Sequence, residues 1–305
     1  MTESLDALLG TYRPRFELKL GELLQARREQ AETLAAQQGL FDALEYSALD
    51  GGKRLRAMLV YLCAHCMGDR SEASLAAADC AAAAIELLHC YSLVHDDLPA
   101  MDDDDMRRGK PSCHVRFGEA TAILAGDALQ ALAFEVLADN TSQQPVRLRE
   151  QLAMLGRAAG ALGMVGGQAV DLAATGASLT LDALCSMHRL KTGALIECAV
   201  GLGALCADAD RDTRDTLQRY AGALGLAFQV RDDVLDVNGS PAMTGKARGA
   251  DAARGKPTFT SVMGLAEAEA YANATVSAAV DALAALGERA GPLAELARYV
   301  AKRES

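Results

Sequence analysis

The sequence predicts an all-α protein, and its composition and the placement of its acids are the observations behind that prediction. Hydrophobic residues make up 50% of the chain, with Ala and Leu dominant, while aromatic residues make up only 4%. Runs of β-branched residues are scarce, which favours helix over strand. Two acidic clusters, at residues 96–105 and 232–236, stand inside otherwise apolar stretches. We therefore expect a helical bundle that brings carboxylates into its interior, with almost no sheet.

One large domain is expected to span residues 1–305, because nothing in the sequence marks a linker. The net charge of −11 argues against nucleic acid and against an anionic membrane surface as partners. The start of the chain lacks an apolar signal region, and no later run approaches the ~20 apolar residues of a membrane span. Eight scattered cysteines are typical of small core residues in a reducing compartment, so we expect a cytoplasmic location.

Helical periodicity assigns most of the chain. A charged amphipathic helix is expected at residues 17–38, and residues 41–47 lead into a turn at 50–52. Apolar helical patterns then cover residues 55–66, 72–98, 120–139, 145–172, 179–207, 210–237, 259–286 and 292–301. Two long connections, residues 99–118 and 238–257, are rich in Gly, Pro and basic residues. Long loops of this kind in compact domains are usually functional or disordered.

The second acidic cluster has helical spacing. Gln229, Asp232, Asp233 and Asp236 fall at i, i+3, i+4 and i+7, so they share one face of the 210–237 helix. The other sides of that helix are apolar, which indicates a polar stripe lining a water-filled cleft within the bundle. A surface stripe would be expected to include compensating lysines one turn away.

The first acidic cluster interrupts apolar surroundings with Asp96 and Asp97. Burying an ionised carboxylate costs on the order of several kcal/mol unless a positive charge compensates it. Hard divalent cations with oxygen ligands provide that charge, and Mg²⁺ usually also holds substrate phosphates. For the aspartates at 103–105, which follow the helix-breaking Pro99, a solvated surface cluster is an equal alternative. The two clusters together indicate a metal-assisted site for a phosphorylated substrate.

Short motifs occur in a fixed order along nearly the whole chain. They are GGKRLR at 51–56, His89, DDLPAMD at 96–102, RRGKP at 107–111, AGDAL at 125–129, GGQAVDL at 166–172, KTGAL at 191–195, FQVRDDVLD at 228–236, TGK ending at Lys246 and GKPT around Lys256. Any one of the shorter motifs is a weak signal, but the ordered set is specific. On these residues the chain resembles the trans-isoprenyl diphosphate synthases, most closely the farnesyl diphosphate synthases of bacteria.

The resemblance implies an isoprenoid-synthase-type helical bundle around a central cavity, with the two aspartate motifs on opposite walls. Mg²⁺, as about three ions per site with Mn²⁺ as the alternative, would lie between the motifs and hold an allylic diphosphate. The implied metal ligands are Asp96, Asp97, Asp102, Asp232 and Asp236. The resemblance also implies a homodimer.

The resemblance divides the remaining site residues between two substrates. The residues that would neutralise the allylic diphosphate are Arg107, Lys191, Lys246 and Lys256. Those that would hold isopentenyl diphosphate are Gly51, Lys53, Arg56, His89 and Arg108. Oxygens of Thr192 and Gln229 would shelter the allylic cation while apolar walls exclude water. Gln168 and Asp171 would line the cavity or bind a metal through water.

Product length is expected to depend on the depth of the cavity. Tyr91 lies five residues before Asp96, which is about 7.5 Å along a helix. By resemblance, an aromatic residue there, with Ser92 beside it, is typical of farnesyl-producing bacterial enzymes. Ordinary core packing is the alternative role for Tyr91.

The implied activity is condensation of isopentenyl diphosphate with dimethylallyl and geranyl diphosphate to give farnesyl diphosphate, by ionisation, condensation and elimination. A geranylgeranyl diphosphate synthase and a non-catalytic subunit of a heteromeric synthase stay open as alternatives. A terpene cyclase would share the first aspartate motif, but its second metal motif normally combines Asn or Asp with Ser or Thr and Glu. Asp232, Asp233 and Asp236 argue against that class.

Overall fold

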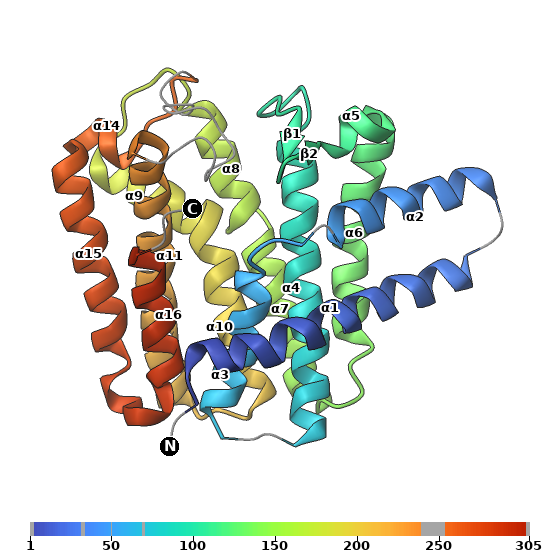
Figure 1. Cartoon of the computed structure of the whole chain (residues 1–305), viewed down its shortest axis with the longest axis horizontal. Coiled ribbons are helices and arrows are strands. Elements are labelled where there is room, and N and C mark those ends of the chain that lie inside the picture. The colour runs from blue at the N-terminus through green and yellow to red at the C-terminus, as the bar shows by residue number, and fades with distance from the viewer. Residues whose placement is uncertain (1–2, 32–33, 50, 69–70, 239–253, 303–305) are drawn as a thin grey trace.

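The computed structural model of the chain describes residues 3–31, 34–49, 51–68, 71–238 and 254–302 as a bundle of helices (Figure 1). The helices are α1 (Leu5–Gln30), α2 (Ala35–Ala48), α3 (Leu55–Cys66), α4 (Glu72–Asp96), α5 (Cys113–Phe117), α6 (Glu119–Ala138), α7 (Pro145–Ala159), α8 (Met164–Ala173), α9 (Leu181–His188), α10 (Ala194–Cys206), α11 (Arg211–Asn238), α14 (Phe259–Met263), α15 (Leu265–Ala282) and α16 (Gly291–Lys302). A π-helical turn, η1 (Arg189–Gly193), joins α9 to α10, and a 3-10 segment, η2 (Ala284–Ala290), joins α15 to α16. Within the described ranges the strands are one short antiparallel pair, β1 (Met106–Arg107) and β2 (Lys110–Pro111). The predicted all-α fold is confirmed.

Helix α10 lies at the centre of the bundle, where it contacts α3, α4, α7 and α11. Apart from Glu197, its side chains are apolar, and Ile196, Val200 and Leu202 are fully buried. A helix that is apolar all round belongs in a core, and each side chain of this size contributes about 1.5–3 kcal/mol when fully buried. The first turn of α10, which follows η1, is therefore held firmly in place.

Helices α4 and α11 both bring their carboxyl ends to the same end of the bundle, the top in Figure 1. Helix α4 begins at Ser71, whose side chain accepts a hydrogen bond from the Ser74 amide, and ends at Asp96 shortly before Pro99. The two acidic clusters therefore lie at one end of the molecule. Helix carboxyl ends carry partial negative charge, so acids there are unfavourable unless cations compensate them.

The first helix differs most from its prediction. Helix α1 begins at Leu5, accommodates Pro14 and ends at Gln30, after which α2 returns beside it as an arm that projects from the bundle (Figure 1). Arg28 of α1 donates hydrogen bonds to Glu45 and Asp42 of α2 across this reversal. The single helix predicted for residues 17–38 is therefore wrong.

Three other predicted helices are interrupted. The one predicted at 145–172 divides into α7 and α8, and a Cβ atom on Gly163 would lie 2.1 Å from the Ala158 carbonyl oxygen. The one predicted at 179–207 contains the π turn η1, and the one at 259–286 divides into α14, α15 and part of η2. The remaining predicted helices agree with the structure to within two residues at each end.

Two helices, α4 and α6, are long and apolar enough to cross a membrane by length and composition. Helix α4 is mostly buried among its neighbours, so its apolar residues belong to the core. Helix α6 buries one side only and leaves Ile123 and Leu124 45% and 56% exposed. The outer side of α6 therefore exposes two large apolar side chains near its start, beside the acids Glu119, Asp127 and Glu135.

Candidate active site

A tight turn brings two acids of the first cluster together. The Asp102 amide donates a hydrogen bond of 2.9 Å to the Asp96 carbonyl, which folds the chain back after α4. Burial raises the pKa of Asp96 to about 6; Lys191 and other cations lower it, and Asp102 raises it further. A carboxylate that is both buried and close to a second carboxylate favours a bound cation.

Asp97 has a different environment from Asp96. Its side chain is 2% exposed and lies against the β1–β2 hairpin, where Arg107 Nε donates to both carboxylate oxygens at 3.0 and 3.1 Å. Burial raises the pKa of Asp97, and the hydrogen bonds from Arg107 oppose that rise. The structure therefore places Asp97 with Arg107, in a contact that attaches the hairpin to α4.

Alternating lysines and aspartates connect four segments near Asp96. Lys256 donates to Asp102 at 2.8 Å and lies 3.5 Å from Asp171 on α8, while Lys191 of η1 donates to Asp171 at 2.6 Å. Burial favours a raised pKa for Asp171, but Lys191 and Lys256 together lower it below its ordinary value. We call these four residues the charge chain. Asp171, whose role the sequence left open, is thus a central member of the candidate site.

The π turn η1 links this chain to α11. Thr192 Oγ1 donates to Gln229 Oε1 at 3.0 Å, and Gln229 Nε2 donates to Asp233 Oδ1 at 2.9 Å. The other oxygen of Asp233 accepts the Phe259 amide at 2.8 Å, at the start of α14. Lys191 and Thr192 are neighbours in sequence, yet their side chains bond to different helices.

The four polar residues predicted to share one stripe of α11 are divided by the structure. Asp233 is 2% exposed and is directed to α14, so its place on a stripe facing a cleft is wrong. Asp232 and Asp236 are partly exposed. Asp232 lies close enough to Arg56 of α3 to raise the pKa of the Arg56 guanidinium. Burial lowers the same pKa by more. Asp232 therefore acts on a residue that lines the cavity described next.

A cavity of about 380 Å³ extends along α4 between α3, α8, η1 and α10. Its charged lining residues are Arg56, Asp96 and Lys191, and apolar side chains such as Leu172 and Leu195 form much of the rest. A space lined by both charged and hydrocarbon groups suits an amphiphile with an anionic head and an apolar tail. Of the residues predicted for the site, those lining it are Arg56, His89, Tyr91, Ser92, Asp96, Gln168, Lys191 and Thr192.

Tyr91 and His95 form part of the cavity wall. Tyr91 is 5% exposed, and its ring meets that of His95 edge-on with 5.7 Å between centroids. His95 Nε2 lies 3.1 Å from the Ile123 carbonyl oxygen on α6. A side chain on Gly126 would overlap the His95 ring, so the wall depends on a glycine of α6.

The residues predicted to hold isopentenyl diphosphate gather around the start of α3. Arg108 Nη1 donates to the Gly51 carbonyl at 2.7 Å, and Arg56 lines the cavity with His89. Burial lowers the pKa of His89 well below its ordinary value, and the nearby Arg56 and Arg108 lower it further. Lys53 is exposed, with its carbonyl accepting from Arg13. Lys246 lies outside the described residues.

Arg54 is a structural residue of this region that sequence reasoning missed. It begins α3 in the left-handed conformation, with φ at 51°, and its side chain is fully buried. The guanidinium donates to Glu17 at 2.8 Å, to the Ala48 carbonyl at 2.8 Å and to Glu86 at 3.4 Å. Glu86, a single acid within an apolar part of α4, was the available sequence signal for a buried cation. These contacts fix the backbone between Lys53 and Arg56.

Metal binding can be tested against this geometry. Among the described residues no three acids, histidines or cysteines converge closely enough to hold an ion by themselves. Asp96 and Asp102 nevertheless offer hard oxygen donors in a partly buried position, and Mg²⁺ is commonly bound by one or two carboxylates with phosphates and waters completing its shell. The donor set therefore fits a divalent cation that is bound together with a phosphorylated substrate.

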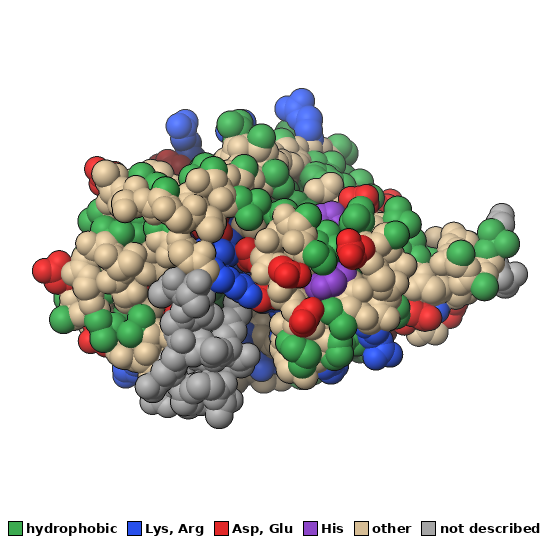
Figure 2. Space-filling view, turned by 90° about the horizontal axis from the view of Figure 1, so that it is seen from above, with side chains coloured by type: hydrophobic (Ala, Val, Ile, Leu, Met, Phe, Trp, Pro, Cys, Tyr) green, Lys and Arg blue, Asp and Glu red, His purple; other side chains and the backbone are tan. Residues whose placement is uncertain are grey.

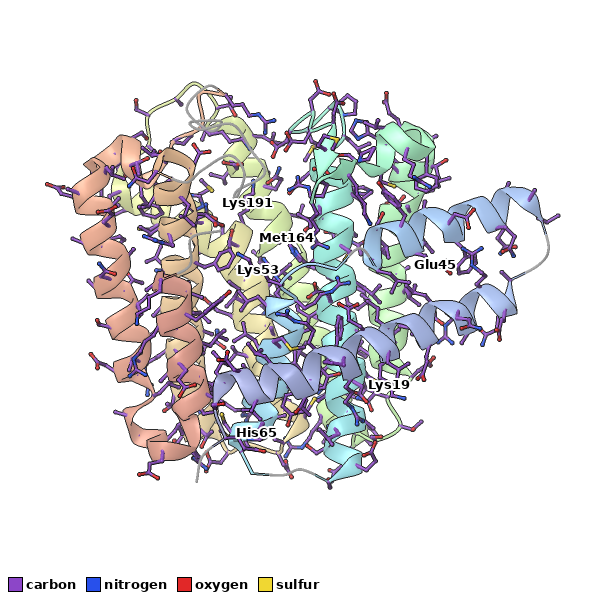
Figure 3. All side chains as sticks on the ribbon, in the orientation of Figure 1. Lys19, Glu45, Lys53, His65, Met164 and Lys191 are labelled. Atoms are coloured by element: carbon purple, nitrogen blue, oxygen red, sulfur yellow. The ribbon has the colours of Figure 1, made fainter. Side chains whose placement is uncertain are left out.

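Charge is concentrated at the end of the bundle where α4 and α11 finish. Seen from above, Lys and Arg side chains meet Asp and Glu side chains in a hollow at the middle of this face (Figure 2). Lys191 and Met164 lie below this face in the central part of the bundle, whereas His65 lies near the opposite end (Figure 3). The candidate site thus opens at one end of the molecule.

The chain is similar to known proteins over most of its length. The polyprenyl synthetase family model matches residues 37–285. The chain is 50% identical over 269 residues to the farnesyl diphosphate synthase of Escherichia coli (strain K12), covering 86% of this chain and 88% of that one. It is 40% identical to the chloroplastic geranylgeranyl pyrophosphate synthase 7 of Arabidopsis thaliana, covering 87% and 77%. A solved geranyltransferase structure from Legionella pneumophila superposes with a TM-score of 0.85 at 36% identity, covering 98% and 97%.

Proposed function

Since the chain belongs to the polyprenyl synthetase family, we propose that it is a short-chain trans-prenyltransferase acting as one catalytic domain. It condenses isopentenyl diphosphate with dimethylallyl diphosphate and then with geranyl diphosphate to give farnesyl diphosphate. The observation that carries the proposal is the cavity beside α4, which combines Asp96, Lys191 and Arg56 with an apolar wall. Such a cavity accommodates both parts of a prenyl diphosphate.

Ionisation of the allylic substrate is the first chemical step. The bond between C1 of the allylic chain and the diphosphate oxygen breaks, which leaves an allylic cation and diphosphate. Divalent cations held by Asp96, Asp102, Asp232 and, with water, Asp236 would add positive charge at the diphosphate. Lys191, Lys256 and Arg107 stabilise the same departing charge from fixed positions, and Lys246, which lies outside the described residues, is proposed to add to them.

The cation is protected before it reacts. Thr192 lines the cavity, and its Oγ1 donates to Gln229 Oε1 at 3.0 Å. Their lone pairs can stabilise positive charge without acting as strong nucleophiles, and the apolar wall excludes water that would quench the cation. The double bond of isopentenyl diphosphate then forms the new carbon–carbon bond, and the released diphosphate takes up the proton that is lost.

Isopentenyl diphosphate is proposed to bind on the side of the cavity formed by α3 and α4. Arg56, Arg108 and Lys53 neutralise its diphosphate, and His89 donates a hydrogen bond as a neutral imidazole. This protonation state follows from the lowered pKa of His89. The Gly51 backbone shapes the same end, because its carbonyl binds the Arg108 guanidinium.

A direct assay tests the proposed activity. The purified chain is incubated with isopentenyl diphosphate, geranyl diphosphate and Mg²⁺, and the product is identified as its alcohol after dephosphorylation. Farnesol is expected, with turnover lost when a chelator removes the metal. Geranylgeraniol would favour the alternative chain length, and absence of any product from the folded chain would favour a non-catalytic subunit.

Product length is proposed to be limited by Tyr91, which is buried in the cavity wall, with Ser92 beside it. Tyr91→Ala should lengthen the product, because removing the ring deepens the space available to the chain. The matched control is Tyr271→Ala, the same truncation on α15 at a residue that packs against Phe259. Gas chromatography of the dephosphorylated alcohols measures the product length of both variants. An unchanged product from Tyr91→Ala would place the limit elsewhere.

The assembly is proposed to be a homodimer in the cytoplasm. The exposed Ile123 and Leu124 side chains of α6 support burial against a second copy, since exposed apolar patches often mark protein–protein contacts. The eight cysteines form no disulfide, which fits a reducing compartment. Light scattering of the purified chain tests the assembly, and a monomeric mass at micromolar concentration would contradict it.

A further inference from the structure

The π turn η1 is packed between two glycines on neighbouring helices. Gly167 of α8 faces the backbone of Lys191, and Gly225 of α11 faces the backbone of Gly193. A Cβ atom on Gly167 would lie 2.2 Å from the Lys191 amide nitrogen and 2.6 Å from its Cα atom. A Cβ atom on Gly225 would lie 3.0 Å from the Gly193 Cα atom. Helix α8 therefore approaches η1 as closely as only glycine permits, and α11 leaves little room for a larger side chain.

Each of these helices also supplies a polar partner one turn beyond its glycine. On α8, four residues after Gly167, Asp171 accepts a hydrogen bond of 2.6 Å from Lys191. On α11, four residues after Gly225, Gln229 accepts one of 3.0 Å from Thr192. The same arrangement thus occurs on both sides of the turn, with close backbone contact first and a side-chain bond one turn later.

The conformation of η1 decides where two adjacent side chains point. A π turn contains one more residue than an α-helical turn, and such turns are frequent at functional sites. Relaxation of η1 to regular α-helix would shift the following register by one residue, which rotates a side chain by about 100° around the axis. Lys191 and Thr192 could then no longer both line the cavity and keep Asp171 and Gln229 as partners. Figure 3 shows Lys191 in this central part of the bundle.

We infer that Gly167 and Gly225 are positioning residues for allylic diphosphate. They hold η1 in its π conformation, so that Lys191 faces the diphosphate and Thr192 faces the adjacent cationic carbon at the same time. This inference rests on the proposed prenyltransferase activity and adds two residues that never touch the substrate.

A graded series of alanine variants tests the inference. Gly167→Ala, with a clash against backbone, should lower kcat with geranyl diphosphate by about 100-fold, as expected for a displacement near 1 Å. Gly225→Ala, with a milder contact, should lower it by about tenfold. The control is Gly222→Ala on α11, where the added carbon meets only the Glu197 side chain at 3.4 Å. Kinetics of the control should equal those of the wild type.

The Michaelis constants separate positioning from a general packing defect. The KM for geranyl diphosphate should rise in Gly167→Ala, while the KM for isopentenyl diphosphate should stay unchanged, because that substrate binds on the α3 and α4 side. Circular dichroism checks that each variant is folded. If Gly167→Ala does not fold, the same comparison of KM values is made with Gly225→Ala. Equal rises of both KM values, or wild-type kinetics in both folded variants, would overturn the inference.

A binding measurement keeps the inference independent of turnover. Calorimetric titration with inorganic diphosphate and Mg²⁺ should show weaker binding to Gly167→Ala than to Gly222→Ala. If the wild type makes no prenyl product but this difference is present, the proposed function fails and the positioning role stands. If the wild type is active and the difference is absent with intact kinetics, the positioning role fails alone.

Discussion

The carboxyl ends of α4 and α11 each carry a pair of adjacent aspartates, and each pair is divided in the same way. Asp96 and Asp232 are partly exposed, whereas Asp97 and Asp233 are each 2% exposed. The buried member of each pair holds a neighbouring segment in place. Asp97 binds the hairpin through the Arg107 guanidinium, and Asp233 binds the start of α14 through the Phe259 amide.

The difference lies in the chemistry of the buried member. Asp97 is held by an opposite charge, whereas the donors to Asp233 include two neutral groups, the Phe259 amide and the Gln229 side chain. A charge pair near the surface is screened by salt, but a hydrogen bond from a buried amide is not. The two ends should therefore respond differently to mutation and ionic strength, although their sequences look alike.

The largest expected effect on turnover comes from the partly exposed aspartate of the α11 pair, Asp232. Asp232→Ala should lower turnover by about 100- to 1,000-fold or more, because charge stabilisation at the departing diphosphate is lost. Helical content should be unchanged, since this side chain is not a packing element. The matched control is Asp215→Ala, an exposed acid on the same helix. Retained activity in Asp232→Ala would show that this carboxylate of α11 does not stabilise the departing diphosphate.

The two buried aspartates, Asp97 and Asp233, should differ in how salt changes their contribution to stability. Asp233→Ala leaves the Phe259 amide without an acceptor and should lower the free energy of unfolding by about 1–3 kcal/mol. Asp97→Ala should cost a similar amount, below the ~3–5 kcal/mol of a fully buried pair, because the Arg107 side chain is 28% exposed. Urea unfolding measures both at low and high salt. Only the cost of Asp97→Ala should shrink in high salt, and equal salt responses would contradict the distinction.

A smaller effect concerns the pH dependence of Asp96. Its pKa is raised to about 6 in the folded chain by burial, so the folded chain binds this proton more tightly than the unfolded chain does. Its contribution to stability is therefore greatest below about pH 4 and is lost as the pH rises through about 6. Asp96→Asn should be more stable than the wild type at pH 8 by about 1–3 kcal/mol, with a difference that vanishes near pH 4. Thermal unfolding across this range is the check; a constant difference would show that Asp96 ionises normally.

The sequence predicted the fold class and most helices because long apolar periodic segments such as residues 55–66 and 72–98 leave little choice of structure. It failed at residues 17–38, because the chain reverses there without Gly or Pro and the reversal is held by tertiary contacts of Arg28 with α2. The π turn was equally invisible, since its conformation depends on Gly167 and Gly225 of other helices.

The sequence predicted which residues form the candidate site better than it predicted the directions of their side chains. Asp96, Lys191 and Thr192 line the cavity as their motifs indicated. Helical spacing alone placed Asp233 on the same face as Asp232, but at an angular separation near 100° a side chain can bond to a neighbouring helix instead. The Phe259 amide, which is distant in sequence, donates a hydrogen bond to Asp233 and so determines the direction of the Asp233 side chain.

The charge chain also has a consequence for how the protein meets its substrate. Lys191 and Lys256 already have carboxylate partners in Asp171 and Asp102. On the proposed function, an arriving diphosphate would have to displace these carboxylates from the two ammonium groups, and divalent cations bound with it would compensate the carboxylates. Binding would then be an exchange of partners between two sets of ions, and a diphosphate that arrives without metal would have no such exchange to offer.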